Sequence, residues 1–406
     1  MKMRFALSLA SALVASAACA VDVRPPEPKD VPPLMVTGSG KTVGTVSEWE
    51  GVRRPEILRT MLERVYGVRP VERPSDLRFT PVGEEDACGG KAVKKIVRGD
   101  YSGPGGKASF EFAAWIPKRT GKVASFVYIS PRVGRTADDP TAGPRTYTLP
   151  TDDIVSRGYA VIAFFNYEFA LDFYDDAGLT SSLATGGVFK AFGPVDAKKR
   201  SPSDWGIVSA WAWGASRIMD WIETEALLDA KRVGVVGLSR NGKTALLAGA
   251  TDTRFAMTVS CCSGMGGAKL NHLDCFGSES VKLIMRPAWR WFCPRFAEWI
   301  DRDKEMPFDQ HWLLALVAPR LLYVSSASED HWAGQRGEFA AAALATPAWN
   351  LYGKAGLVHH GFPKPDLPLH AGNIGYHLRS GLHDITAYDW QCYLDFADGH
   401  GWNLPE

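Results

Sequence analysis

One serine in this sequence stands between an apolar run and a segment of small residues, a setting typical of a catalytic serine. The stretch reads VVGLSRNGKTALLAGA, residues 235–250, with Ser239 at its centre. A serine on a sharp strand-to-helix turn is exposed as a nucleophile, and small neighbours two positions away keep the turn free of clashes. Gly237 supplies one neighbour, but the second position holds Asn241 and Gly242 comes one place late. We predict that Ser239 is a nucleophile, with Asn241 tolerating unusual backbone angles; the alternative is a serine that caps a helix.

Two cations follow the serine closely. Arg240 is the next residue, a position whose backbone N–H helps to form an oxyanion hole, and its guanidinium can add a charged donor. Lys243 lies one helical turn beyond Ser239 on the same face, within reach of substrate hydroxyl or carboxylate oxygens. The alternatives are a surface arginine and a solvated lysine. As a pair beside a nucleophile, they predict recognition of an oxygen-rich substrate.

A base and an acid for this serine stand near the C-terminus. Hydrolases that present a serine in this way run in the order serine, acid, histidine, with the histidine after the last strand. His383 directly precedes the last amphipathic helical stretch and fits that place. The apolar run RLLYVSS, residues 320–326, is followed by Glu329 and Asp330, and a carboxylate at that strand end would orient the imidazole. We predict Asp330 as the acid, with Glu329 as the alternative.

The elements that must position these residues alternate along the chain. Short apolar runs alternate with helical patterns from about residue 120 onward, which indicates a parallel sheet covered on both faces. Two β-like runs between residues 91 and 117 precede them. We predict an α/β fold, a three-layer αβα sandwich with a mostly parallel central sheet and antiparallel strands at its N-terminal edge. The buried parallel strands are expected at residues 123–130, 158–167, 232–237, 255–261 and 320–326.

The length of 406 residues and the 46% hydrophobic content support one large domain. We assign residues 46–406 to a single catalytic domain, preceded by an extended proline-rich lead at residues 21–45. Two long connections, near residues 167–202 and 353–382, are expected to be insertions that build the rim of the site.

The N-terminus has the layout of a secretory signal. Two basic residues precede an apolar run and the small-residue sequence Ala18-Cys19-Ala20, so we expect residues 1–20 to be a signal peptide cleaved after Ala20. The apolar run is too short to span a membrane. Lipidation of Cys19 is the alternative, which Ser16 disfavours because a lipobox prefers leucine there. The mature protein is thus expected to be secreted or periplasmic.

Charge and cysteine spacing bear on possible partners. With 46 basic and 45 acidic residues the net charge is +1, so no overall field favours nucleic acid or an anionic membrane. Six cysteines remain besides Cys19, and none stands in a C-x-x-C or comparable zinc-binding pattern. We expect a monomer without metal, cofactor or nucleic-acid partner.

Several motifs, taken in order, resemble the glucuronoyl esterases, carbohydrate esterase family 15. GLSRNGKTA resembles the family signature G-x-S-R-x-G-K, whose Arg-x-x-Lys pair ordinary lipases lack. The resemblance covers most of the chain from about residue 95 to 397. Four later landmarks are SGMGGA (263–268), DQHWLLALVAPR (309–320), SASEDHWAGQRGEF (326–339) and GLHDITAYDWQCYLDFAD (381–398).

The resemblance implies an α/β-hydrolase without metal or cofactor. Such an enzyme cleaves the ester between 4-O-methyl-glucuronic acid of glucuronoxylan and a lignin alcohol, through a glucuronoyl-enzyme intermediate. Carried over by position, the implied site residues are the nucleophile Ser239, the oxyanion-stabilising Arg240, the sugar-contacting Lys243 and Glu279, Trp332 at the uronate site, and the base His383.

One position departs from the family pattern. Many members carry a triad glutamate just before the SGMGGA motif, where this chain has Cys262. A thiol cannot hold a histidine as a carboxylate does, so the acid must come from elsewhere, which favours Asp330 at the later strand end. Two alternatives remain: an esterase for another carbohydrate ester, acetyl or feruloyl, and a carbohydrate-binding homologue with impaired catalysis.

Overall fold

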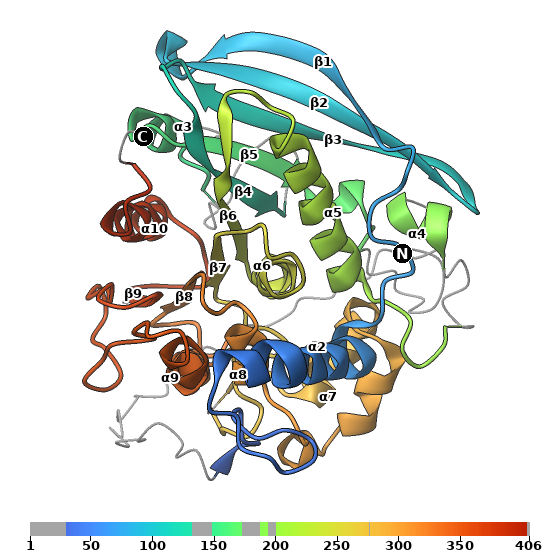
Figure 1. The fold of residues 1–406 in the computed structure, drawn as a ribbon, viewed down its shortest axis with the longest axis vertical. Helices are drawn as coiled ribbons and strands as arrows, with labels where there is room; N and C mark the ends of the chain where they lie inside the picture. The colour runs from blue at the N-terminus through green and yellow to red at the C-terminus, as the bar shows by residue number, and fades with distance from the viewer. Residues whose placement is uncertain (1–29, 132–147, 173–186, 194–199, 276, 404–406) are drawn as a thin grey trace, which may run out of the picture.

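The structure, a computed structural model, describes residues 30–403 apart from 132–147, 173–186, 194–199 and 276 (Figure 1). The predicted signal peptide, its cleavage site after Ala20 and Cys19 lie outside the described residues. No helix in the described part of the chain is long and apolar enough to cross a membrane.

A twisted sheet of nine strands forms the centre of the molecule, in the order β1-β2-β3-β5-β4-β6-β7-β8-β9 (Figure 1). The pairs among β1, β2, β3 and β5 are antiparallel, whereas the strands from β5 to β9 pair in parallel. The predicted sheet, mostly parallel with antiparallel strands at the N-terminal edge, is confirmed. The strands are β1 Arg78–Ala87, β2 Ala92–Gly103, β3 Gly106–Pro117, β4 Val123–Ser130, β5 Ala160–Phe165, β6 Leu228–Leu238, β7 Met257–Cys261, β8 Leu321–Ala327 and β9 Ile374–Arg379.

Helices cover both faces of the sheet and complete the three layers. Side chains that alternate along β4 enter two separate cores: Val127 and Ile129 face α5 and α6, whereas Phe126 and Tyr128 face α3 and α10. This alternation is the period of two that a strand buried on both faces requires. The helices are α1 Val46–Glu48, α2 Arg54–Met61, α3 Thr151–Ser156, α4 Gly187–Phe192, α5 Ile207–Ile222, α6 Arg240–Thr251, α7 Val281–Ala288, α8 Gln310–Ala315, α9 Gln335–Asn350 and α10 Ala387–Gly399.

The last strand, β9, lies within the segment 353–382 that the sequence analysis assigned to an insertion. Its sequence IGYHLR contains a histidine and an arginine, which are atypical of a fully buried strand. Both are paired with one carboxylate: Asp389 lies 2.8 Å from Nε2 of His377 and 2.9 Å from Nε of Arg379. Because the partner comes from α10, the strand could not be recognised from its own residues.

The described part of the other insertion, residues 167–202, supplies α4 and a buried aspartate, Asp172. Residues 173–186 and 194–199 of that segment lie outside the described chain.

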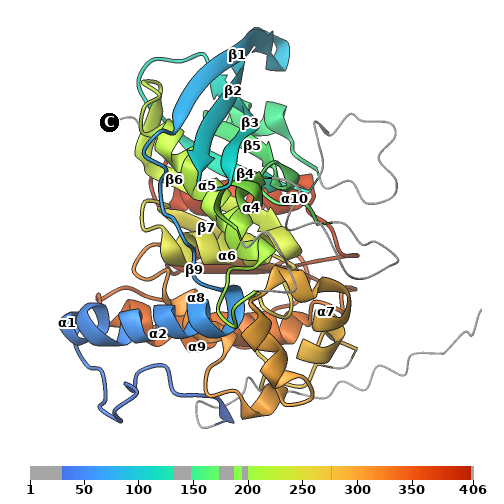
Figure 2. The same cartoon turned by 90° about the vertical axis from the view of Figure 1, so that its right-hand side faces the viewer.

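The proline-rich lead packs against the body from residue 30 onward. Val31, Leu34 and Val43 are buried, and Nε of Arg53 donates a hydrogen bond of 2.8 Å to the carbonyl of Leu34. This segment leads into α1 and α2, which lie with α8 and α9 at one end of the molecule (Figure 2).

Candidate active site

Four neighbouring parallel strands deliver the predicted site residues to one edge of the sheet. The strands β6, β7, β8 and β9 are adjacent, and parallel strands place their carboxyl ends at the same edge. Ser239 directly follows β6 and Cys262 directly follows β7. Asp330 stands three residues beyond β8, and His383 four residues beyond β9. Residues spread over 145 positions of the chain, 239 to 383, thus meet at one place.

The backbone of Ser239 has φ 61° and ψ −126°, a conformation that serine rarely adopts. Tight packing keeps the turn in this shape. A Cβ at Gly237 would lie 2.0 Å from the carbonyl oxygen of Asn241, and one at Gly242 would lie 2.8 Å from that of Cys261. Both glycines are therefore required sterically, and the late glycine serves contact with β7 rather than the turn itself.

Asn241 does not take unusual backbone angles, contrary to the prediction. It lies within the first turn of α6, and the positive φ belongs to Ser239. The Asn241 side chain instead donates to the carbonyl of Ile129 at 3.0 Å and accepts from Nδ2 of Asn166 at 3.2 Å. These bonds tie the start of α6 to the ends of β4 and β5, so the asparagine anchors the turn.

His383 and Asp330 form a close pair. Nδ1 of His383 lies 2.5 Å from Oδ2 of Asp330, whose other oxygen accepts from the backbone N–H of Ala333 at 3.3 Å. The Asp330 side chain is 3% exposed and that of His383 is 18% exposed. Glu329, the alternative acid, is exposed to solvent. The structure thus brings Asp330, and not Glu329, to the imidazole.

Cys262 lies beside this pair. One ligand atom from each of Cys262, Asp330 and His383 falls within 4.8 Å of the others. The cysteine is buried with a positive φ of 45°, and its Sγ lies 3.9 Å from that of Cys261. The contact with Cys261, together with burial, raises the pKa of the Cys262 thiol well above its usual value. The side chain at this position is therefore a protonated thiol.

Arg240 rests on an aromatic ring and a buried carboxylate. Its Nη1 donates to Oδ2 of Asp172, and its guanidinium carbon lies 5.2 Å from the ring centroid of Trp291. Nε1 of Trp291 donates to the other oxygen of Asp172 at 2.9 Å. The carboxylate is 2% exposed and the Arg240 side chain 32% exposed. The guanidinium is therefore held in a fixed orientation while about a third of the arginine side chain stays accessible.

Lys243 and Glu279 form a second buried pair next to the serine. Nζ of Lys243 lies 3.4 Å from Oε2 of Glu279 and also donates to the carbonyl of Ser263. Burial lowers the pKa of Lys243, against the opposing charge of Glu279. The N–H of Glu279 donates to the carbonyl of Trp332 at 2.9 Å, and the Trp332 side chain is 47% exposed. The two polar residues predicted to contact a sugar, Lys243 and Glu279, thus lie next to the exposed Trp332.

Sequence reasoning missed a buried carboxylate behind the site. Glu338, on α9, accepts from the backbone N–H groups of Ser263 and Gly264 at 2.6 and 3.0 Å, and from Oγ of Ser326 at 2.6 Å. It joins the end of β8 to the loop that contacts Lys243. Burial raises its pKa to about 7, despite these donors. A lone glutamate inside the apolar stretch GEFAAAALA was the one available signal.

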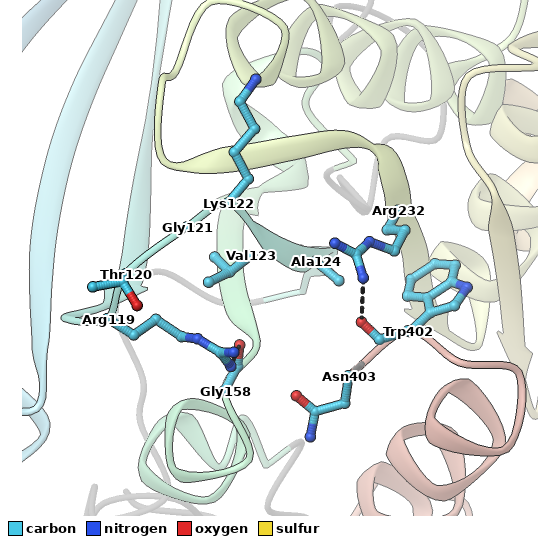
Figure 3. Close-up of a pocket in the computed structure, with 10 residues that line it drawn as sticks. All are labelled: Arg119, Thr120, Gly121, Lys122, Val123, Ala124, Gly158, Arg232, Trp402 and Asn403. Atoms are coloured by element: carbon cyan, nitrogen blue, oxygen red, sulfur yellow. Dashed lines mark hydrogen bonds between the residues drawn. The ribbon is translucent and has the colours of Figure 1, made fainter. Parts of the chain in front are cut away.

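A separate pocket of about 230 Å³ lies at the opposite edge, where the parallel strands begin (Figure 3). It is lined by the start of β4 and by Gly158, Arg119 and Arg232, among others. Arg232 pairs with Asp229 at 2.5 Å and donates to the carbonyl of Trp402 at 3.0 Å. This pocket is not part of the candidate site.

A mostly parallel sheet with helices on both faces, and a strained serine on the turn between β6 and α6, define an α/β-hydrolase. Comparison with known proteins identifies the family within this class. A family model described as "Glucuronyl esterase, fungi" matches residues 145–353. The carbohydrate esterase MZ0003, from an unknown prokaryotic organism, is 33% identical over 397 residues, which cover 91% of this chain and 89% of the relative.

Two further relatives are glucuronoyl esterases. The structure of a glucuronoyl esterase from Solibacter usitatus superposes with a TM-score of 0.81 at 34% identity, over 92% of this chain and 98% of that one. A 4-O-methyl-glucuronoyl methylesterase of Podospora anserina is 35% identical over 158 residues, 36% of this chain and 32% of its own. The chain belongs to the glucuronoyl esterases, carbohydrate esterase family 15.

The raised pKa of Glu338 makes a prediction about stability. In the folded state the Glu338 carboxyl holds its proton up to a higher pH than its ordinary pKa of 4.5 would allow. The protonated carboxyl therefore contributes to the free energy of unfolding in full below pH 4.5, and this contribution is lost as the pH rises through about 7. We expect the free energy of unfolding of the wild type, relative to that of Glu338→Gln, to fall across this interval. Urea unfolding of both proteins at a series of pH values measures it, and parallel pH profiles would contradict the assignment.

Proposed function

We propose that this enzyme cleaves the ester bond that joins 4-O-methyl-glucuronic acid branches of glucuronoxylan to lignin alcohols. As a family 15 glucuronoyl esterase it hydrolyses 4-O-methyl-glucuronoyl esters. The observation that carries the finer proposal is the buried pair Lys243–Glu279, one helical turn from the strained Ser239. A buried ammonium and a buried carboxylate beside a nucleophile suit the vicinal hydroxyls of a sugar acid.

In the proposed reaction His383 takes the proton of Ser239 through Nε2, and Ser239 attacks the uronoyl carbonyl. Asp330 accepts the hydrogen bond from Nδ1, which sets the tautomer and stabilises the imidazolium. The protonated His383 then donates to the departing alcohol oxygen. Water, activated by the same imidazole, hydrolyses the glucuronoyl-enzyme and releases the sugar acid.

Arg240 is the proposed charged donor to the tetrahedral oxyanion, together with its own backbone N–H. Its pairing with Asp172 and its position over Trp291 support this role, because a donor that is already oriented requires no reorganisation during the reaction. The same ring lies 5.8 Å from Nζ of Lys243, so one tryptophan supports both cations.

Trp332 offers an exposed apolar face to the sugar ring, next to Glu279. We further propose that residues 1–20 direct export of the chain, so that the enzyme meets its polymeric substrate outside the cytoplasm, and that it acts as a monomer.

Hydrolysis of benzyl glucuronate, compared with release of acetate from acetylated xylan and of ferulate from a feruloyl ester, tests the substrate class. We expect the glucuronate ester to be hydrolysed with the highest kcat/KM, and Ser239→Ala to remove that activity. Preference for the acetyl or feruloyl ester would contradict the proposal. Failure of the wild type to hydrolyse any ester or to react with a fluorophosphonate would instead favour a carbohydrate-binding homologue.

The two candidate acids are separated by paired variants. Asp330→Ala should lower kcat by up to about 10⁴-fold, because loss of a triad carboxylate leaves the imidazole in the wrong tautomer. Glu329→Ala should stay within a few-fold of the wild type, since Glu329 is exposed to solvent and Asp330 holds the hydrogen bond to Nδ1 of His383. Benzyl glucuronate kinetics and circular dichroism are measured for both variants. A near-normal kcat for Asp330→Ala would overturn the assignment.

Asp172 is expected to act through Arg240. Asp172→Asn should lower kcat more than it changes KM, by about tenfold or more, because an oxyanion donor acts in the transition state. In an Arg240→Ala background the same change should have little further effect, which a double-mutant cycle on kcat measures. Asp220→Asn is the matched control: this carboxylate is also 2% exposed and paired with arginine, but it lies on α5. Additive effects of Asp172→Asn and Arg240→Ala would contradict a positioning role.

A further inference from the structure

The thiol of Cys262 completes a set of metal-ligating atoms. Cys262, Asp330 and His383 offer a sulfur, a carboxylate oxygen and an imidazole nitrogen, all within 4.8 Å of one another. In the described part of the chain, no other group of three histidine, cysteine or acidic side chains gathers its ligand atoms in this way. The proposed mechanism uses Asp330 and His383 but gives Cys262 no task.

We propose that Cys262, Asp330 and His383 bind a thiophilic divalent cation such as Zn²⁺, and that the bound cation switches the esterase off. The inhibitory part rests on the proposed function, through the role of His383 as the base. The binding part rests on the ligand atoms alone.

The ligand set suits this class of cation. Sulfur with nitrogen favours Zn²⁺ and similar ions over Mg²⁺ or Ca²⁺, and three protein ligands leave a fourth position open for water. Bond lengths of roughly 2.0 to 2.3 Å in a tetrahedral site place ligand atoms about 3.4 Å apart. The cysteine must therefore approach, and the 2.5 Å contact between His383 and Asp330 must open by about 1 Å. The proposal therefore requires side-chain rotations at Cys262 and His383.

The electrostatic surroundings also favour a cation. Two buried carboxylates lie beside the thiol: Asp330 belongs to the ligand set, and Glu338 accepts from the backbone N–H of Ser263, the residue after Cys262. A divalent ion would offset their negative charge. His383 is partly exposed, so the ion has a route from solvent.

Binding requires no oxidation or reduction. The bonds from the metal to sulfur, nitrogen and oxygen form as the Cys262 thiol proton passes to solvent and the proton of His383 moves, through solvent, from Nδ1 to Nε2. With Nδ1 bound to the metal, the neutral imidazole carries its proton on Nε2, the atom that must accept the proton of Ser239. Asp330 is engaged at the same time. The nucleophile then has no base, and hydrolysis stops.

Metal inhibition of Cys262 variants tests the proposal. After treatment with a chelator, hydrolysis of benzyl glucuronate is followed as ZnCl₂ is added to the wild type, Cys262→Ala and Cys262→Ser. We expect the wild type to lose its activity, and both variants to require at least about tenfold more Zn²⁺, since they lack one ligand. Cys293→Ala is the matched control: this cysteine is also buried, its Sγ donates to the carbonyl of Glu63 and it is not part of the ligand set, so the variant should keep the sensitivity of the wild type. Equal sensitivity of wild type and Cys262 variants would overturn the proposal.

A second measurement does not depend on catalysis. Cd²⁺ added to Ser239→Ala should produce the ultraviolet charge-transfer absorption of a thiolate-bound metal, at one equivalent per chain, and Ser239→Ala/Cys262→Ser should lack it. Absence of that absorption in Ser239→Ala would contradict the metal site, whatever the substrate of the enzyme. Failure to hydrolyse glucuronate esters, with the absorption present, would contradict the proposed function and leave the binding site standing.

Discussion

The positive φ of Ser239 is the constraint on which the rest of the site depends. Such a backbone conformation costs of order 1–3 kcal/mol and persists only where the surroundings enforce it. Here β6 and α6 enforce it together, because Gly237 lies against the carbonyl of Asn241 and Gly242 against that of Cys261. The hydrogen bonds of Asn241 then fasten α6 to the neighbouring strands. Packing and hydrogen bonds among β4, β5, β6, β7 and α6 thus offset the cost of the Ser239 backbone conformation.

Charges around the turn follow a common arrangement. Arg240 is paired with Asp172, Lys243 with Glu279, and His383 with Asp330, and each carboxylate is more than nine-tenths buried. A buried carboxylate is costly without a hydrogen-bonded or charged partner, so each pair orients the side chain that the carboxylate contacts. Trp291 lies beside both cations, Arg240 and Lys243. The electrostatic field at the serine is therefore set before a substrate arrives, which is what stabilisation of an oxyanion requires.

Cys262 and Glu338 show how a neutral side chain affects the charge balance behind the site. At the position of Cys262 the thiol stays protonated beside Asp330, so a single carboxylate serves the imidazole. Glu338 remains close enough to Asp330 for its pKa to be raised further by that charge. A second ionised carboxylate in place of the thiol would add to this repulsion. The thiol reduces the negative charge and at the same time supplies a soft ligand atom.

The sequence by itself determined the parallel sheet, the serine turn and the order of nucleophile, acid and histidine, because apolar strand runs and strand-end residues are local patterns. It left Asp330 and Glu329 as alternatives, since neighbours in sequence differ only in which side of the loop they face. Tertiary structure decided that choice by burying Asp330 against His383. It also decided β9, whose His377 and Arg379 are buried only because Asp389 of α10 neutralises them. The supports Asp172, Trp291 and Glu338 were likewise beyond the sequence, because each meets its partners only in the folded chain. Asp172 pairs with Arg240, the Trp291 ring lies against Arg240, and Glu338 accepts from Ser263, all far apart in sequence.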